Sequence, residues 1–194
     1  MQVLFLCSAN QCRSPMAAGL LQRHLARSKR CRPITVASAG FASAGYPATD
    51  GAVAVMEDIG IDITGHRSRK LDRELLDGAD LILGMTRQHV VDAAVLAPAA
   101  WPRTFPLMDA VRRAGETGPL PVGEEPAYWV ALLHAGRRPA TVLALPPSDD
   151  IADPIDQPLD AYRRARDQLD GLTRRLAELL CTGDARVEGE YIQT

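Results

Sequence analysis

The sequence predicts an α/β fold: a single doubly wound domain whose central four-stranded parallel sheet carries helices on both faces. Short apolar runs alternate along the chain with segments of helical period, and this alternation favours parallel strands joined by crossover helices. The chain of 194 residues, 46% of them hydrophobic, is suited to one domain with its own core. We therefore expect the domain to span residues 1–194.

Four apolar runs are the expected strands, and they lie at residues 2–6, 34–38, 79–83 and 103–107. Three helices are expected between them, at residues 15–28, 50–59 and 86–96. A long helix is expected from Leu159 onward, because apolar residues then recur at steps of three or four, as on a helix that covers a sheet face. These residues are Leu159, Tyr162, Ala165, Leu169, Leu172, Leu176 and Leu179.

Residues 114–150 break the alternation of strands and helices. Glycines and prolines cluster toward both ends of this segment, and residues 124–135 between them have the pattern of one amphipathic helix. We interpret 114–150 as an insertion of helix and loops, of the kind that is usually functional or mobile. An apolar stripe within it either docks on the core, as we expect, or contacts a partner; it consists of Tyr128, Trp129, Leu132 and Leu133.

The overall composition argues against nucleic acid and membranes as partners. The net charge is −2 and the mean hydropathy is −0.09, so the charge balance does not attract a polyanion or an anionic lipid surface. No apolar stretch is long enough to cross a bilayer. We expect no secretory leader, because the sequence passes at once into the first expected strand. We therefore expect a cytoplasmic protein with reduced thiols, in which Cys31 and Cys181 have no function of their own.

A cysteine stands where the first strand is expected to pass into the first helix. The run from Cys7 to Pro15 reads CSANQCRSP, and a loop of this length at a helix start can wrap an oxyanion with backbone N–H groups. Arg13 can then fork onto two oxygens, while the Ser14 hydroxyl can hydrogen-bond to the Cys7 thiolate. The alternative is a buried structural cysteine at a strand end. The capping Ser14 and the helix-favouring Pro15 argue against that alternative.

Cleavage of a phosphate ester by a cysteine also needs an acid for the leaving group. Asp153 is the candidate, because Pro154 fixes the chain directly after it and holds its carboxyl on a stiff loop. From the pattern alone, the acidic stretch around Asp153 could equally be a solvated loop with no catalytic role.

Several motifs occur together in a fixed order along the chain. They are Cys7-x5-Arg13-Ser14-Pro15, Ser38-Ala39-Gly40, Gly65-His66-Arg67-Ser68-Arg69, the run ADLILGM at 79–85, and Asp153-Pro154. Taken together, they resemble the low-molecular-weight protein tyrosine phosphatases. The resemblance covers roughly residues 2–113 and 150–181 and leaves 114–150 as extra sequence.

The resemblance implies a two-step mechanism that uses no metal and no cofactor. Cys7 attacks phosphorus while Asp153 protonates the leaving oxygen, and water activated by Asp153 then hydrolyses the phosphocysteine. The implied catalytic residues are Cys7, Arg13 and Asp153, and the implied phosphate-binding residues are Ser8, Ala9, Asn10, Gln11, Cys12, Arg13 and Ser14. Loop support would come from Asn10, Ser14, Ser38 and His66. The implied partner is a phosphorylated protein, and we expect a monomer.

Three positions depart from the family pattern and bear on the substrate. Ala9 stands where the family usually has glycine, Gln11 fits neither the tyrosine-directed nor the arginine-directed members, and Ile155 replaces the usual aromatic. The residues expected at the substrate rim are Gln11, Phe41, Tyr46 and Ile155. We expect phosphotyrosine as the substrate, but the run from Phe41 to Ser43 also resembles the bacterial protein-arginine phosphatases, so that alternative stays open.

Two other functions remain as alternatives. Arsenate reductases share this loop, but the thioredoxin-coupled ones relay electrons through further cysteines, and residues 77–100 contain none. A non-catalytic phosphate-binding module would need no nucleophile or acid, and the presence of Cys7, Arg13, Ser14 and Asp153 argues against it.

Cys12 lies inside the same loop as Cys7 and raises a redox hypothesis. A reversible disulfide between the two would shield Cys7 from over-oxidation. The alternative is that Cys12 is a small residue packed at the start of the helix. Peroxide should then inactivate the wild type reversibly and the Cys12→Ser variant irreversibly, and equal recovery of both would contradict the hypothesis.

Overall fold

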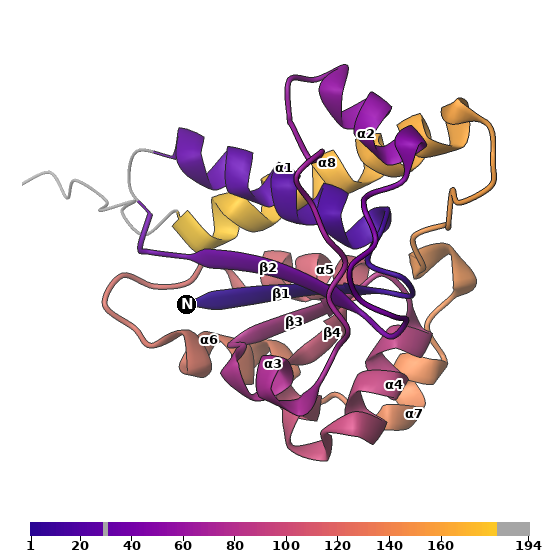
Figure 1. The fold of residues 1–194 in the computed structure, drawn as a ribbon. Coiled ribbons are helices and arrows are strands. Elements are labelled where there is room, and N and C mark those ends of the chain that lie inside the picture. Colours follow the sequence, from indigo (N-terminus) through magenta and orange to yellow (C-terminus); the bar gives the residue numbers. More distant parts are fainter. Residues whose placement is uncertain (29–30, 182–194) are drawn as a thin grey trace, which may run out of the picture.

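The structure is a computed structural model, and it describes residues 1–28 and 31–181. Residues 182–194 of the expected domain lie outside this part. One parallel sheet is formed by β1 (Gln2–Cys7), β2 (Thr35–Gly40), β3 (Leu81–Gly84) and β4 (Thr104–Pro106), in the order β2-β1-β3-β4 (Figure 1). The chain therefore winds outward in both directions from β1, which confirms the expected doubly wound fold. Ligands of such sheets bind beyond the carboxyl ends of the strands where the winding reverses.

The helices cover both faces of the sheet (Figure 1). One face carries α1 (Arg13–Arg27), α2 (Asp50–Glu57) and α8 (Leu159–Cys181), and the other carries α3 (Arg73–Gly78) and α4 (Arg87–Leu96). After β4 the chain forms α5 (Leu107–Thr117), α6 (Pro126–His134) and α7 (Pro139–Leu143). Short 3₁₀ helices lie at Pro98–Arg103 and Pro147–Asp149.

The central strand β1 shows how the sequence divides the core. Side chains alternate along a strand, so Val3 and Phe5 belong to the cluster under α1 and α8, whereas Leu4 and Leu6 belong to the cluster on the opposite face. All four side chains are fully buried. The carboxyl end of β1 is thus rigidly packed on both sides, and Cys7 is its last residue.

The structure also contains helices that the sequence pattern did not predict. Helix α3 is only six residues long, and its start is set by the Asp72 side chain, which accepts a hydrogen bond from the Leu75 amide. Helix α5 begins directly after the strand residue Pro106 and runs to Thr117, so residue 114, where we placed the start of the insertion, lies inside a helix. The helix expected at 124–135 is confirmed as α6.

The apolar stripe of α6 docks on the core through half of its residues. Trp129 is fully buried, Leu133 is buried beside it, and the indole nitrogen donates to the carbonyl of Gly118 at 3.0 Å. Tyr128 and Leu132 remain exposed. The segment is therefore a packed part of the domain.

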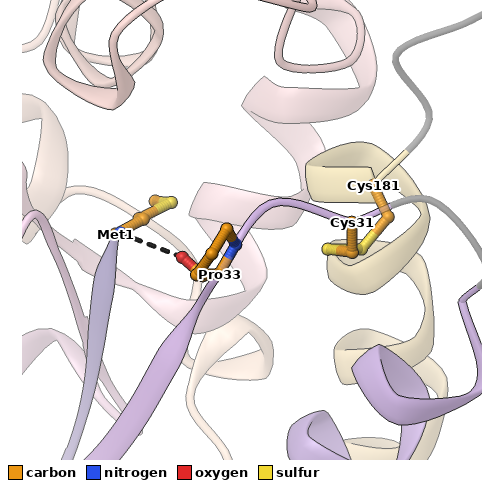
Figure 2. Close-up of a disulfide and its surroundings, with 4 residues drawn as sticks. All are labelled: Met1, Cys31, Pro33 and Cys181. Atoms are coloured by element: carbon orange, nitrogen blue, oxygen red, sulfur yellow. Dashed lines mark hydrogen bonds between the residues drawn. A yellow bond between two sulfur atoms is a disulfide. The ribbon is translucent and has the colours of Figure 1, made fainter.

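Cys31 and Cys181 form a disulfide (Figure 2), so the expectation that all thiols are reduced and that these two cysteines have no role is wrong for this pair. Cys31 lies shortly before β2 and Cys181 is the last residue of α8, and their Cα atoms are 4.4 Å apart. Because 150 positions separate them in the chain, only the packing of α8 against α1 and the sheet reveals that they meet. In the same region, the Met1 amino group donates to the Pro33 carbonyl (Figure 2).

Within residues 1–28 and 31–181, no helix has both the length and the apolar character that a membrane crossing requires.

Candidate active site

The loop between β1 and α1 forms a tight turn at the carboxyl edge of the sheet; we call residues 7–14 the cysteine loop. Asn10, at its centre, adopts a φ of 54°, a left-handed conformation that side chains other than glycine and asparagine rarely take. Gly40 at the end of β2 lies directly against this loop. A Cβ on Gly40 would be 2.7 Å from the Asn10 amide nitrogen and 2.9 Å from the Ala9 carbonyl carbon.

Asn10 holds the turn through a complete set of hydrogen bonds. Its side chain is fully buried; Nδ2 donates to Ser14 Oγ at 2.9 Å and to Ser38 Oγ at 2.8 Å, and Oδ1 accepts from the Arg69 amide at 2.8 Å. The Asn10 carbonyl lies 2.6 Å from His66 Nε2 and accepts from it. The residues expected to support the loop, Asn10, Ser14, Ser38 and His66, are thus joined in one network.

The Cys7 thiol is buried at the floor of the cysteine loop, and its sulfur lies 2.9 Å from Ser14 Oγ. Because Asn10 Nδ2 already donates to Ser14 Oγ, the Ser14 hydroxyl hydrogen is available to the sulfur. A hydroxyl that donates to sulfur stabilises the thiolate, which is the nucleophilic form.

Arg13, within the cysteine loop, is buried, and its guanidinium is held by three hydrogen bonds. NH1 donates to the Ile151 carbonyl at 2.9 Å, and NH2 donates to Ser8 Oγ at 3.3 Å and to Asp153 Oδ2. Nε is buried, and its N–H has no acceptor among the residues that the structure describes. This N–H, together with the NH2 hydrogen that Asp153 releases when its carboxyl is protonated, suits a planar fork onto an oxyanion.

A second loop, residues 149–156, brings Asp153 to Arg13; we call it the aspartate loop. It is anchored to the end of β3 by a hydrogen bond from the Ile151 amide to the Met85 carbonyl at 2.8 Å. The Arg87 guanidinium binds Asp150 Oδ2 through Nε at 3.2 Å and NH2 at 3.1 Å, and the Arg87 amide donates to Asp150 Oδ1 at 2.8 Å. Asp153 itself remains partly exposed, as a group that exchanges protons must be.

Cys12, the second thiol of the loop, is also buried and free. Burial raises its pKa to about 12, and the negative charges of Asp153 and Cys7 act in the same direction. Cys12 therefore stays protonated at neutral pH, and the loop contains one candidate nucleophile, Cys7.

The four expected rim residues lie in different surroundings. Gln11 is half-buried, and its backbone carbonyl accepts a hydrogen bond from the Thr49 amide at 2.8 Å. Tyr46 has 53% of its surface exposed. Ile155 lies within the aspartate loop and packs against the main core. Phe41 stacks on the ring of His89 with the centroids 5.7 Å apart, so one of its faces is covered.

His89 is the site residue that sequence reasoning missed. It is buried in the first turn of α4, and its Nε2 lies 3.1 Å from Ser8 Oγ in the cysteine loop. The available signal was Thr86-x-x-His89 directly after the third expected strand, since residues that follow neighbouring parallel strands converge at one edge of the sheet.

Comparison with known proteins places this geometry among characterised relatives. The family model described as low molecular weight phosphotyrosine protein phosphatase matches residues 2–118. A protein-arginine-phosphatase of Geobacillus stearothermophilus is 35% identical over 182 residues, which are 93% of this chain and 97% of the relative. The low molecular weight protein-tyrosine-phosphatase Ptp of Acinetobacter johnsonii is 40% identical over 106 residues, 54% of this chain and 70% of that protein.

Solved structures agree with the sequence relatives. A YwlE mutant from Bacillus subtilis superposes with a TM-score of 0.69 at 30% identity, covering 92% of this chain and 97% of that one. A low molecular weight protein tyrosine phosphatase from T. tengcongensis superposes with a TM-score of 0.67 at 31% identity, covering 92% and 98%.

Proposed function

The chain belongs to the low molecular weight phosphotyrosine protein phosphatase family, a family of hydrolytic enzymes, and from that premise we propose that it hydrolyses phosphotyrosine in proteins through a phosphocysteine at Cys7. One observation carries the proposal: Arg13 NH2 contacts both Ser8 in the cysteine loop and the Asp153 carboxylate. The loop that carries the nucleophile and the acid thus meet at one guanidinium, which supports phosphoryl transfer at this point.

In the first step the Cys7 thiolate attacks phosphorus and the P–S bond forms as the P–O bond to the leaving group breaks. Asp153 enters as the carboxylic acid and gives its proton to the leaving oxygen. Arg13 Nε and NH2 and the backbone N–H groups of residues 8–13 bind the non-bridging oxygens, where negative charge is concentrated.

In the second step a water molecule attacks the phosphocysteine. The Asp153 carboxylate takes a proton from this water, the P–S bond breaks, and inorganic phosphate leaves. The Ser14 hydroxyl, 2.9 Å from the sulfur, stabilises the departing thiolate. In this mechanism the protein contributes side chains and backbone groups, and water is the only other reactant besides the substrate.

The test is turnover of p-nitrophenyl phosphate by the wild type and by three variants. Cys7→Ser should abolish turnover, and Arg13→Lys should lower kcat/KM by about a hundredfold or more through loss of the fork. Asp153→Asn should remove the alkaline limb of the pH profile of kcat/KM, which reports loss of the proton that Asp153 donates. If the wild type turns over no faster than Cys7→Ser, the protein is a phosphate-binding module and the enzyme proposal is wrong. Thiol-dependent reduction of arsenate that exceeds phosphatase activity would favour a reductase.

A second candidate substrate is phosphoarginine in proteins. It is supported by two relatives that match this chain nearly end to end, both named protein-arginine-phosphatase, from G. stearothermophilus and B. subtilis. The polar amide of Gln11 at the loop fits a guanidinium as well as a phenol. Comparing kcat/KM on one peptide that carries either phosphotyrosine or phosphoarginine decides between the two substrates.

We further propose that residues 1–194 act as one monomeric phosphatase domain in the cytoplasm, with residues 114–150 as an insertion. Catalysis needs Cys7 as a free thiol, and a reducing compartment maintains it. The same compartment favours the reduced form of Cys31 and Cys181, whose disulfide lies near the start of β2, at the end of the strands opposite the cysteine loop. Fractionation of cells and light scattering of the purified protein test these two points.

A further inference from the structure

His89 is a buried ring that the mechanism above does not use. It is 4% exposed, and it occupies the third position of α4, where its Nδ1 accepts from the Thr86 amide at 3.1 Å in a capping box. Phe41 stacks parallel to it, with 8° between the ring planes. Contacts on an edge and on a face therefore fix both the position and the plane of the imidazole.

These contacts also determine which ring nitrogen carries the proton. A backbone N–H can only donate, so Nδ1 must be unprotonated to accept from Thr86. A neutral imidazole then carries its hydrogen on Nε2, which lies 3.1 Å from Ser8 Oγ. His89 is consequently the donor and Ser8 Oγ the acceptor.

Burial keeps His89 in this neutral form, against the charges of three nearby carboxylates. Burial lowers its pKa to about 4, and the positive charge of Arg13 acts in the same direction. The carboxylates that face it, Asp92, Asp153 and Asp150, oppose this shift without cancelling it. At neutral pH the ring is therefore a fixed single donor toward the cysteine loop.

Ser8 is left with one hydrogen to give. Its oxygen accepts from His89 Nε2 and from Arg13 NH2 at 3.3 Å, and a hydroxyl oxygen has two lone pairs. Both acceptor positions are thereby filled, so the hydroxyl acts as a donor. It does so beside the guanidinium that also contacts Asp153, which is where the phosphoryl oxygens bind in the proposed function.

We propose that His89 is a positioning residue that, by donating to Ser8 Oγ, turns the Ser8 hydroxyl into a dedicated donor to the phosphoryl group. The proposal rests on the proposed function and adds a side-chain donor to the backbone N–H groups of the loop. The Ser8 hydroxyl contacts the substrate, whereas His89 acts only through Ser8.

A double-mutant cycle tests this coupling. The variants are Ser8→Ala, His89→Phe and the double variant, with phenylalanine chosen because it keeps the stack on Phe41 and removes both ring nitrogens. Either single change should lower kcat/KM for p-nitrophenyl phosphate by about tenfold, the value of one hydrogen bond to a charged group. In the Ser8→Ala background, His89→Phe should cost less than about twofold, because its partner is already gone.

The cycle separates positioning from folding. Two outcomes would overturn the proposal. One is that His89→Phe lowers kcat/KM equally in the wild-type and the Ser8→Ala backgrounds, and the other is that neither single change lowers kcat/KM. If His89→Phe does not fold, His89→Gln replaces it in the same cycle, since glutamine at this position retains a capping box with Thr86. The control is His134→Gln, which lies in α6 outside the site and should leave kcat/KM unchanged.

A binding measurement distinguishes failure of this inference from failure of the proposed function. In a Cys7→Ser background, inorganic phosphate is titrated by calorimetry into proteins with and without Ser8→Ala and His89→Phe. The same non-additive losses in affinity are expected even if the protein turns out to be a binding module. Additive losses there would overturn the coupling whatever the activity of the wild type.

Discussion

Gly40 shows at the scale of single residues why the cysteine loop keeps its shape. Its hypothetical Cβ would collide with three backbone atoms of the loop, at 2.7 Å from the Asn10 nitrogen and 2.9 Å from the Ala9 carbon and the Cys7 oxygen. Backbone atoms cannot move aside as a flexible side chain can. The left-handed turn at Asn10 therefore depends on the lack of a side chain at Gly40 in the neighbouring strand as much as on its own hydrogen bonds.

We expect Gly40→Ala to lower kcat/KM by about a hundredfold or more, because a shift of this size displaces the donors from the phosphoryl oxygens. Steady-state kinetics on p-nitrophenyl phosphate measures it. The matched control is Gly115→Ala, an exposed helical glycine whose Cβ would meet nothing within 4 Å. That change should leave activity intact and stabilise the fold by up to about 1 kcal/mol; equal activity of the two variants would contradict the argument.

The buried neutral state of His89 predicts how stability depends on pH. Its pKa falls from 6.5 to about 4 on folding. Between pH 6.5 and pH 4 the unfolded chain therefore binds a proton at this residue and the folded chain does not. The free energy of unfolding should then fall with decreasing pH, by about 2 kcal/mol at pH 5 and about 3 kcal/mol at pH 4 from this group. Urea unfolding of the wild type and of His89→Gln at several pH values measures the difference. Parallel curves would show that His89 does not titrate in this way.

At the scale of elements, the aspartate loop is hydrogen-bonded to the segment that joins β3 to α4. Ile151 bonds to Met85 at the end of β3, and Asp150 bonds to the backbone and side chain of Arg87 at the start of α4. Arg87 NH1 also donates to the carbonyl of Leu145. The segment that ends the insertion is thereby tied to the sheet two residues before Asp153, and this sets where the acid stands.

We expect Arg87→Ala to loosen the aspartate loop and so to weaken the acid more than the nucleophile. The loss in kcat/KM should be about tenfold for phenyl phosphate, whose leaving group needs protonation, and clearly smaller for p-nitrophenyl phosphate. Kinetics on both esters provides the test. Arg175→Ala, in an exposed pair with Glu178 on α8, is the control. The same loss on both esters would mean that Arg87 does not act through the acid.

The elements that sequence analysis located are those whose own pattern identifies them. The buried apolar runs became β1 to β4, and the long amphipathic period became α8. Helix α3 was missed because six residues contain too few turns for a periodicity, and α5 because its start is set by the preceding strand residue Pro106. Elements defined by their neighbours cannot be found from their own sequence.

The same distinction holds within the site. Cys7, Arg13 and Asp153 follow from the spacing of a loop and from one proline, and these are local signals. The contact between Ser8 and His89 joins residues 81 positions apart, and the close approach of Gly40 depends on the pairing of β1 with β2. Such contacts arise only when the sheet assembles. The sequence therefore indicates the reacting groups but not the residues that position them.

At the scale of the whole molecule, the Cys7 thiol and the disulfide between Cys31 and Cys181 lie at opposite ends of the sheet. Cys7 ends β1, where the reaction is proposed, whereas Cys31 precedes β2 and pairs with Cys181 at the end of α8. The disulfide holds the last turn of α8 against the segment that enters β2, and α8 packs along α1, whose first turn carries Arg13. It is therefore placed to affect the stability of the domain rather than the chemistry.

The length of chain that this bond closes sets the size of the effect. With 150 positions between the cysteines, the loss of unfolded-state entropy stabilises the folded protein by at most about 5 kcal/mol. We expect a reductant to lower the Tm of the wild type by several degrees and to leave the Tm of a Cys31→Ser, Cys181→Ser double variant unchanged. Because the bond lies away from the cysteine loop, the double variant should keep the wild-type kcat/KM measured under reducing conditions. A wild-type Tm that does not respond to reductant would mean that the disulfide adds nothing to the stability that the packing of α8 on α1 already provides.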